Sequence, residues 1–123
     1  MKVVALDYGR ARTGVAVSDP TGELARPLCV VERARSEGGL ARLADIVAEE
    51  EAELVVVGLP LTLKGERGEQ ARETEAFVEV LRHVLDVPVE TYDERFTSKL
   101  AGGDDAGAAA HLLSDYLDWS RAS

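Results

Sequence analysis

A run of four apolar residues in the middle of the chain, Leu54-Val55-Val56-Val57, narrows the folds that this sequence can adopt. The run ends at Gly58 and lies between two segments in which apolar residues recur at helical spacing. Before the run these positions are Leu40, Leu43, Ala44 and Val47, and after it they are Phe77, Val78, Leu81 and Leu85, preceded by the polar Thr74 at the same spacing. Because a strand that is apolar on both faces is typical of a parallel sheet covered by helices, the pattern predicts an α/β fold.

The rest of the chain extends this sheet. We predict strands at 2–7, 13–18, 27–32, 54–58 and 87–92, and helices at 37–52, 66–85 and 105–119. The first three strands are expected to form an antiparallel meander, because Asp19-Pro20-Thr21-Gly22 is a turn signal between the second and the third. The last two strands are separated by a helix and are expected to be parallel. The predicted architecture is one domain, residues 1–123, with a mixed five-stranded sheet flanked by helices.

Composition and charge restrict the class of protein further. The chain has 123 residues, 46% of them hydrophobic, which is enough for a core without disulfides or structural metals. A net charge of −9 argues against a protein that coats nucleic acid indiscriminately through its phosphates. The only cysteine, Cys29, lies in an apolar run and is expected to be a small buried residue rather than a nucleophile. No stretch approaches about 18 consecutive apolar residues, so we expect a cytoplasmic protein without a membrane partner.

Acidic residues occupy three positions that such a sheet can bring together. Asp7 ends the first strand, Asp93 and Glu94 follow the last strand, and Asp104 and Asp105 open the last helix. Since the carboxyl ends of these strands share one edge of the sheet, we expect the first two groups to converge there. A helix that crosses that edge would add Asp105. Clustered carboxylates need a cation, for which Mg²⁺ or Mn²⁺ is the natural candidate, and two such ions can clamp a phosphodiester.

Each acid also has a purely structural interpretation. Asp7 could be a turn residue that bonds its own backbone. Asp104 or Asp105 could be the N-cap of the last helix. The residues alone do not choose between Asp93 and Glu94 as the acid that follows the last strand.

The segment from Gly58 to Gly68 lies between a buried strand and an amphipathic helix, where backbone N–H groups can receive a phosphate. Lys64 and Arg67 add positive charge that could meet a nucleic-acid backbone, although a loop that needs polar residues for solubility would look much the same. Further basic residues near the glycine-containing loops are Arg10, Arg12, Arg26, Arg95 and Lys99. Charge alone is equally compatible with a local basic rim and with a well-solvated acidic surface.

Several motifs stand in order along almost the whole chain. They are Leu6-Asp7-Tyr8-Gly9 with Arg12 and Gly14, Gly-Val-Ala-Val-Ser-Asp from Gly14, Val-Gly-Leu-Pro-Leu from Val57 and Asp-Glu-Arg-Phe-Thr from Asp93, with Gly65, Gly68, Ala71 and Phe77 also in place. Together they resemble the YqgF/RuvX family. That family has the ribonuclease H-like fold of Holliday-junction resolvases and is described as a pre-16S rRNA nuclease, also proposed as a resolvase.

The resemblance implies roles for individual residues. By position it assigns divalent metals to Asp7, Glu94 and Asp105, with Asp93 beside Glu94, and it puts Arg12 and Arg95 near the scissile phosphate with Thr97 as a supporting residue. Two features depart from the family pattern. Ala11 stands where members usually carry lysine, and only the segment from Ser98 to Asp104 replaces a longer helical and basic stretch before the last acid.

We therefore expect a nuclease that depends on Mg²⁺ or Mn²⁺ and that processes the 5′ end of pre-16S rRNA. The nearest alternative is a Holliday junction resolvase that cuts branched DNA as a dimer. A catalytically silent nucleic-acid-binding module is a further alternative. An actin-like nucleotide-binding fragment is disfavoured, because 123 residues cannot supply the second lobe that closes over a nucleotide. A monomer and a homodimer are both compatible with the sequence.

Overall fold

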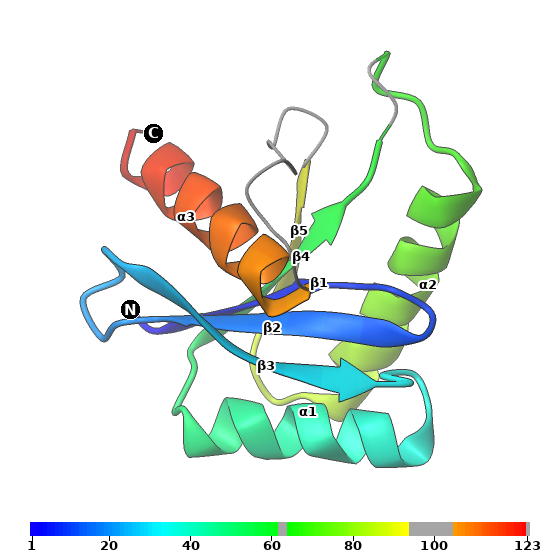
Figure 1. The fold of residues 1–123 in the computed structure, drawn as a ribbon, viewed down its shortest axis with the longest axis horizontal. Coiled ribbons are helices and arrows are strands. Elements are labelled where there is room, and N and C mark those ends of the chain that lie inside the picture. Colours follow the sequence, from blue (N-terminus) through cyan, green and yellow to red (C-terminus); the bar gives the residue numbers. More distant parts are fainter. Residues whose placement is uncertain (62–63, 94–104, 123) are drawn as a thin grey trace.

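The computed structural model describes residues 1–61, 64–93 and 105–122, which form a mixed sheet with helices on both faces (Figure 1). In chain order the elements are β1 (Val3–Asp7), β2 (Arg12–Ser18), β3 (Ala25–Glu32), α1 (Glu37–Glu49), β4 (Leu54–Leu59), α2 (Glu69–Val84), β5 (Val89–Asp93) and α3 (Asp105–Ala122). The order of strands across the sheet is β3-β2-β1-β4-β5. The predicted α/β fold with a mixed sheet is confirmed.

The strand directions also agree with the prediction. β2 is antiparallel to both β1 and β3, whereas β4 is parallel to both β1 and β5. Between β2 and β3, Gly22 has a φ of +75°, and its N–H donates to the carbonyl of Asp19 at 3.0 Å. A positive φ is strained for residues that carry a Cβ, so a glycine closes this turn.

Two of the differences at element starts have local causes. α2 begins at Glu69 rather than at 66, because Gly65 has a φ of +81° and Gly68 is extended as the N-cap residue. β5 begins at Val89 rather than at 87. Pro88 before it has no N–H to donate to a sheet ladder.

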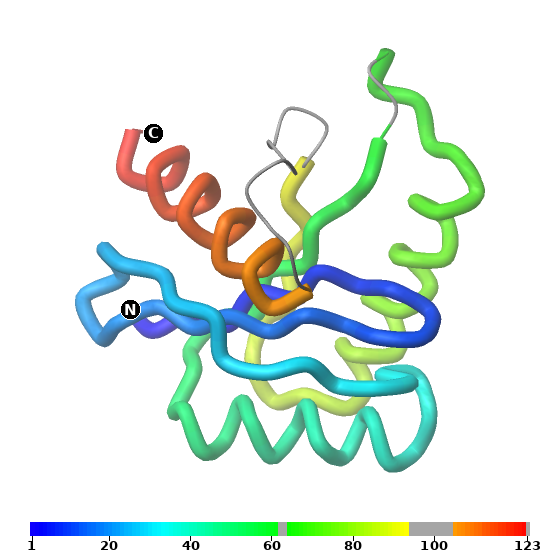
Figure 2. Tube along the Cα trace, in the orientation of Figure 1, coloured from blue at the N-terminus to red at the C-terminus, as the bar shows by residue number. Residues whose placement is uncertain are grey.

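Two apolar cores lie on the two faces of the sheet. One core lies between the strands and helices α1 and α2, and the other lies between the strands and α3. Figure 2 traces the helices on the two faces of the sheet, with the β1–β2 loop beside the first turns of α2. Within the described ranges, no helix is both long enough and apolar enough to cross a membrane.

The alternation of side chains along β1 decides which residues reach which core. Val3 and Ala5 face α3, whereas Leu6 faces α1 and α2. By the same alternation Asp7 lies on the α3 face, while Tyr8 packs against the core on the opposite face. The candidate acid and the aromatic residue that follows it are therefore separated by the sheet.

Cys29 is half-buried in β3, and burial raises the pKa of its thiol. Since β3 is an edge strand, its side chains are covered less completely than the apolar sequence predicted. A raised thiol pKa leaves less thiolate at neutral pH, which agrees with the expectation that Cys29 is not a nucleophile.

The turn after β2 predicts a loss of stability in acid. Asp19 accepts hydrogen bonds from the hydroxyl of Thr21 at 2.6 Å and from the N–H groups of Leu24 at 3.1 Å and Glu23 at 2.8 Å. These bonds lower the pKa of Asp19 from 3.8 to about 2. Because the folded state holds the charged form, the stabilisation is complete above about pH 4 and is lost as the pH falls toward 2.

We expect Asp19→Asn to be less stable than the wild type at pH 5, and the difference to shrink as the pH falls from about 4 to 2. Urea unfolding at a series of pH values measures it. Asp45→Asn, at an exposed position of α1, controls for the removal of one negative charge. A difference between Asp19→Asn and the wild type that stays constant down to pH 2 would contradict the prediction.

Candidate active site

Two of the predicted acids, Asp7 and Asp105, lie on the same face of the sheet, on either side of Gly14. In the pairing of β1 with β2, Asp7 lies opposite Gly14. Asp105 is the first residue of α3, and its carbonyl oxygen lies very close to Gly14. A Cβ added to Gly14 would be 1.8 Å from that oxygen. The bare backbone of Gly14 therefore lets α3 begin directly on β2, opposite Asp7 and on the same face of the sheet.

A cationic side chain already contacts Asp105. Nε of Arg12 lies 3.2 Å from Oδ2 of Asp105, and the two side chains are 65% and 38% exposed. Arg12 begins β2 two residues before Gly14, so alternation puts it on the face that also carries Asp7. Three charged side chains thus gather at one edge of the sheet.

β5 orients the acid at its end differently. Val89 belongs to the core under α1 and α2, whereas the ring of Tyr92 contacts that of Tyr116 on α3, with centroids 5.6 Å apart. Alternation from these residues puts Asp93 on the α1 and α2 face, opposite to that of Asp7. The other candidates of this region, namely Glu94, Arg95, Thr97 and Asp104, lie outside the described residues.

Asp7 and Asp105 are the predicted metal ligands that the structure describes. Among residues 1–61, 64–93 and 105–122, no three His, Cys, Asp or Glu side chains lie close enough together to hold an ion. Asp7 and Asp105 nevertheless fit a hard divalent cation, because both are carboxylates and Asp105 already binds a guanidinium.

The loop between β1 and β2 is held against α2 on the opposite face. The ring of Tyr8 stacks on Phe77, with centroids 4.3 Å apart and an angle of 19° between the planes. One turn earlier on α2, Glu73 accepts two hydrogen bonds from the guanidinium of Arg10, one of them at 2.9 Å. These bonds lower the pKa of Glu73 and raise that of Arg10. The middle of the loop is therefore tied to α2.

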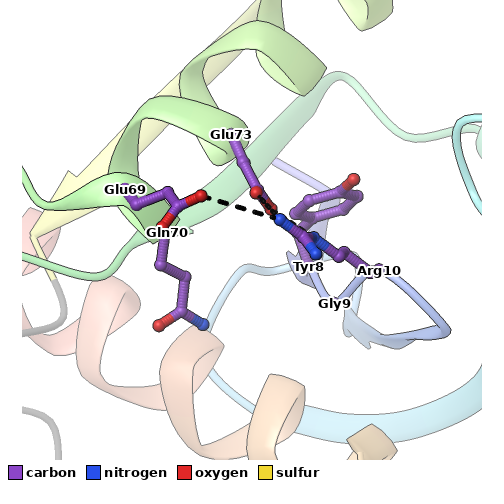
Figure 3. Close-up of a pocket in the computed structure, with 6 residues that line it drawn as sticks. All are labelled: Tyr8, Gly9, Arg10, Glu69, Gln70 and Glu73. Carbon is purple, nitrogen blue, oxygen red and sulfur yellow. Dashed lines mark hydrogen bonds and ion pairs between the residues drawn. The ribbon is translucent and has the colours of Figure 1, made fainter.

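This docking leaves a pocket of about 260 Å³ (Figure 3). It is lined by Tyr8, Gly9, Arg10, Glu69, Gln70 and Glu73. Arg10 lies between two carboxylates, since its terminal nitrogen is also 4.0 Å from Glu69. Because the charges of this pocket pair with one another on the face away from Asp105, we do not assign it the chemistry predicted for the acids.

Two of the described arginines near this edge pair with carboxylates, Arg10 with Glu73 and Arg12 with Asp105. In the loop before α2, Arg67 contacts Glu75 at 3.3 Å. Arg26 contacts Glu50 at 3.8 Å at the opposite end of the sheet, where Lys2 contacts the same carboxylate. Lys64 is exposed in the loop before α2. Carboxylates thus balance part of the arginine charge beside the acids, and the choice between a basic rim and an acidic surface stays a prediction.

Two features of this region escaped the sequence interpretation. The pairing of Arg10 with Glu73 joins residues 63 positions apart, and no local spacing signals it. The contact of Gly14 with α3 did have a signal, because a glycine inside a strand often marks the close approach of another backbone.

Comparison with known families and proteins agrees with the motifs. A family model described as "RuvX: Holliday junction resolvase" matches residues 1–119. A protein of Chloroflexus aggregans, named as a candidate pre-16S rRNA nuclease, is 40% identical over 97% of this chain and 94% of its own length. A protein of a Sulfurihydrogenibium species with the same name is 45% identical over 95% of this chain and 90% of its own. The resemblance inferred from the motifs is confirmed.

Solved structures share the fold. RuvC of T. thermophilus in complex with a Holliday junction substrate has a TM-score of 0.63 at 18% identity, covering 100% of this chain and 96% of that one. The fowlpox virus Holliday junction resolvase has a TM-score of 0.53 at 10% identity, covering 97% and 99%. At such identities the likeness concerns the fold alone, and it confirms the expected ribonuclease H-like architecture.

Proposed function

The chain belongs to the RuvX family, and from that premise we propose that it is a nuclease that hydrolyses phosphodiester bonds with Mg²⁺ or Mn²⁺. Its substrate is RNA, and its reaction is the processing of the 5′ end of pre-16S rRNA. The names of the two bacterial relatives described above support this choice of substrate.

The observation that carries the proposal is the contact of Asp105 with Gly14, opposite Asp7. Two carboxylates from distant parts of the chain share one face at the carboxyl edge of the sheet, where α/β folds bind their ligands. Turn and cap residues with a purely structural role have no reason to gather at one point. A cation that binds both carboxylates would give them a reason to share this face, and this supports the proposal.

Within this proposal the residues have separate tasks. Asp7, Glu94 and Asp105 hold the metal ions, which when bound lower the pKa of the attacking water and stabilise the leaving oxygen. Glu94 is preferred to Asp93 as the metal ligand, because the alternation of side chains along β5 puts Asp93 on the face of the sheet opposite to that of Asp7. The residues that bind or orient the nucleic-acid backbone are Arg12, Arg95 and Thr97 near the scissile phosphate, and Lys64 and Arg67 farther from it.

A Holliday junction resolvase is the second candidate, and the description of the family model favours it. The chemistry at the phosphate would be the same in both. Resolution requires two paired cuts, and therefore a symmetric dimer whose two acid clusters face one junction. The preferred substrate and the oligomeric state separate the two candidates.

The test is cleavage of a labelled RNA that spans the 5′ end of a 16S precursor and of a labelled four-way DNA junction, each with Mn²⁺, Mg²⁺ or chelator. We expect cutting of the RNA that depends on the metal, with little cutting of the junction. Paired symmetric cuts in the junction by a protein that is dimeric in light scattering would instead identify a resolvase. If the protein binds RNA but cuts neither substrate with any metal, it is a binding module and the proposed activity is wrong.

A further inference from the structure

We propose that Arg12 occupies the cation position at Asp105 when no metal ion is bound, and that it moves from Asp105 to the substrate phosphate when the ion binds. The inference rests on the proposed function, because it concerns how the same acids take up metal and substrate in turn. It gives Arg12 two partners, a carboxylate before metal binding and a phosphate after it.

The contact between the two residues suits such an exchange. It joins Nε of Arg12 to Oδ2 of Asp105 at 3.2 Å, and the Arg12 side chain is 65% exposed. The guanidinium can therefore turn toward solvent without breaking a packed core. An exposed ion pair of this kind changes an equilibrium constant by only about fivefold. A competing cation can therefore displace the guanidinium from Asp105.

The neighbouring arginine, Arg10 in the loop before β2, behaves differently. Arg10 donates through Nε and a terminal nitrogen to both carboxylate oxygens of Glu73. This two-point contact ties the loop to α2 on the face opposite to Asp105. Of these two arginines, Arg12 is thus the one that faces the candidate acids, and Arg10 provides a matched control.

Charge makes the two cations exclude each other at Asp105. A guanidinium and a divalent metal ion that share one carboxylate at short range repel each other. Asp7 lies on the same face and attracts the divalent ion more strongly than the singly charged guanidinium. A guanidinium released beside the acids can donate two parallel hydrogen bonds to a phosphate. Metal binding and substrate binding are then coupled through one side chain.

Calorimetric titration with Mn²⁺ tests the competition. We expect Arg12→Gln to bind Mn²⁺ about fivefold more tightly than the wild type, equivalent to about 1 kcal/mol. Arg12→Lys keeps the charge and should resemble the wild type. Arg10→Gln removes a positive charge from the same loop but not from Asp105, and its Mn²⁺ affinity should stay within twofold of the wild type.

NMR detects the release of Arg12 from Asp105 directly. It therefore separates this release from a general effect of the protein's charge on Mn²⁺ affinity. The Nε–H resonance of Arg12 should move on addition of Mg²⁺ with the midpoint of Mg²⁺ binding, and in Asp105→Asn it should already differ from the wild type without Mg²⁺. The Nε–H resonance of Arg10 should not move. An Arg12 signal that is unchanged at saturating Mg²⁺ would overturn the proposal.

The outcomes distinguish this inference from the proposed function. If the wild type binds Mn²⁺ and cuts RNA but Arg12→Gln binds the ion no more tightly, the inference is wrong and the nuclease proposal stands. If Arg12→Gln binds Mn²⁺ more tightly and the Arg12 resonance moves, yet no nucleic acid is cut, the inference stands and the nuclease proposal falls. If neither protein binds Mn²⁺, both are wrong.

Discussion

Alanine at Gly14 is expected to lower the free energy of unfolding by about 3 kcal/mol and to move the start of α3 away from β2. The added Cβ would lie 1.8 Å from the carbonyl oxygen and 2.3 Å from the carbonyl carbon of Asp105. Both atoms belong to the backbone, so no side-chain rotation relieves the clash. α3 must shift although Leu112 and Leu113 anchor it in the core beneath.

Urea unfolding followed by fluorescence measures this loss, because the only tryptophan, Trp119, lies on α3. Gly38→Ala is the matched control, since a Cβ at Gly38 in α1 meets nothing within 4 Å. Alanine favours helices over glycine, so this control should be as stable as the wild type or more stable by up to about 1 kcal/mol. Equal stability of the Gly14 and Gly38 variants would show that α3 does not rest on Gly14. The same shift of α3 should also weaken Mn²⁺ binding, because it moves Asp105 away from Asp7.

Asp7→Asn is expected to slow nucleic-acid cleavage by about a thousandfold and to leave the fold intact. Asparagine has nearly the same shape as aspartate but carries no charge, so a metal ion loses one anionic ligand. Each 1.36 kcal/mol of lost transition-state stabilisation is a tenfold loss of rate, and a bound ion contributes several kcal/mol. Initial rates at saturating metal measure the effect, and circular dichroism with thermal unfolding checks the fold.

Three further variants make this result specific. Asp45→Asn removes one negative charge at an exposed position of α1 and should keep the wild-type rate within twofold. Glu94→Gln should lose as much activity as Asp7→Asn, whereas Asp93→Asn should lose less than tenfold, because Asp93 alternates to the opposite face. The reverse order for these two would show that the acid after β5 was chosen wrongly. An Asp7→Asn protein that cuts at the wild-type rate would remove the acid cluster from catalysis altogether.

Much of the fold could be predicted because the relevant signals are local. Val55 and Val56 are buried on opposite faces of β4, as an apolar run without alternation indicates. Thr74, a polar residue on an otherwise apolar stripe, is also buried in α2, since helical spacing decides which side of a helix meets the sheet. Element starts were less accurate, because the positive φ of Gly65 is a backbone property that neighbouring residues permit but do not require.

By itself, the sequence determined the order of strands and helices, the mixed sheet and the acids that are candidates for chemistry, because alternation, helical spacing and motifs depend on neighbours in the chain. Only the tertiary structure decided that Arg12 pairs with Asp105, that Arg10 pairs with Glu73, and that α3 begins on Gly14. Neither local spacing nor charge separates two arginines that lie two positions apart. They differ in the folded protein because Arg12 reaches the α3 face of the sheet, whereas Arg10 is tied to α2 on the opposite face. These two faces exist only once the sheet is packed between its helices.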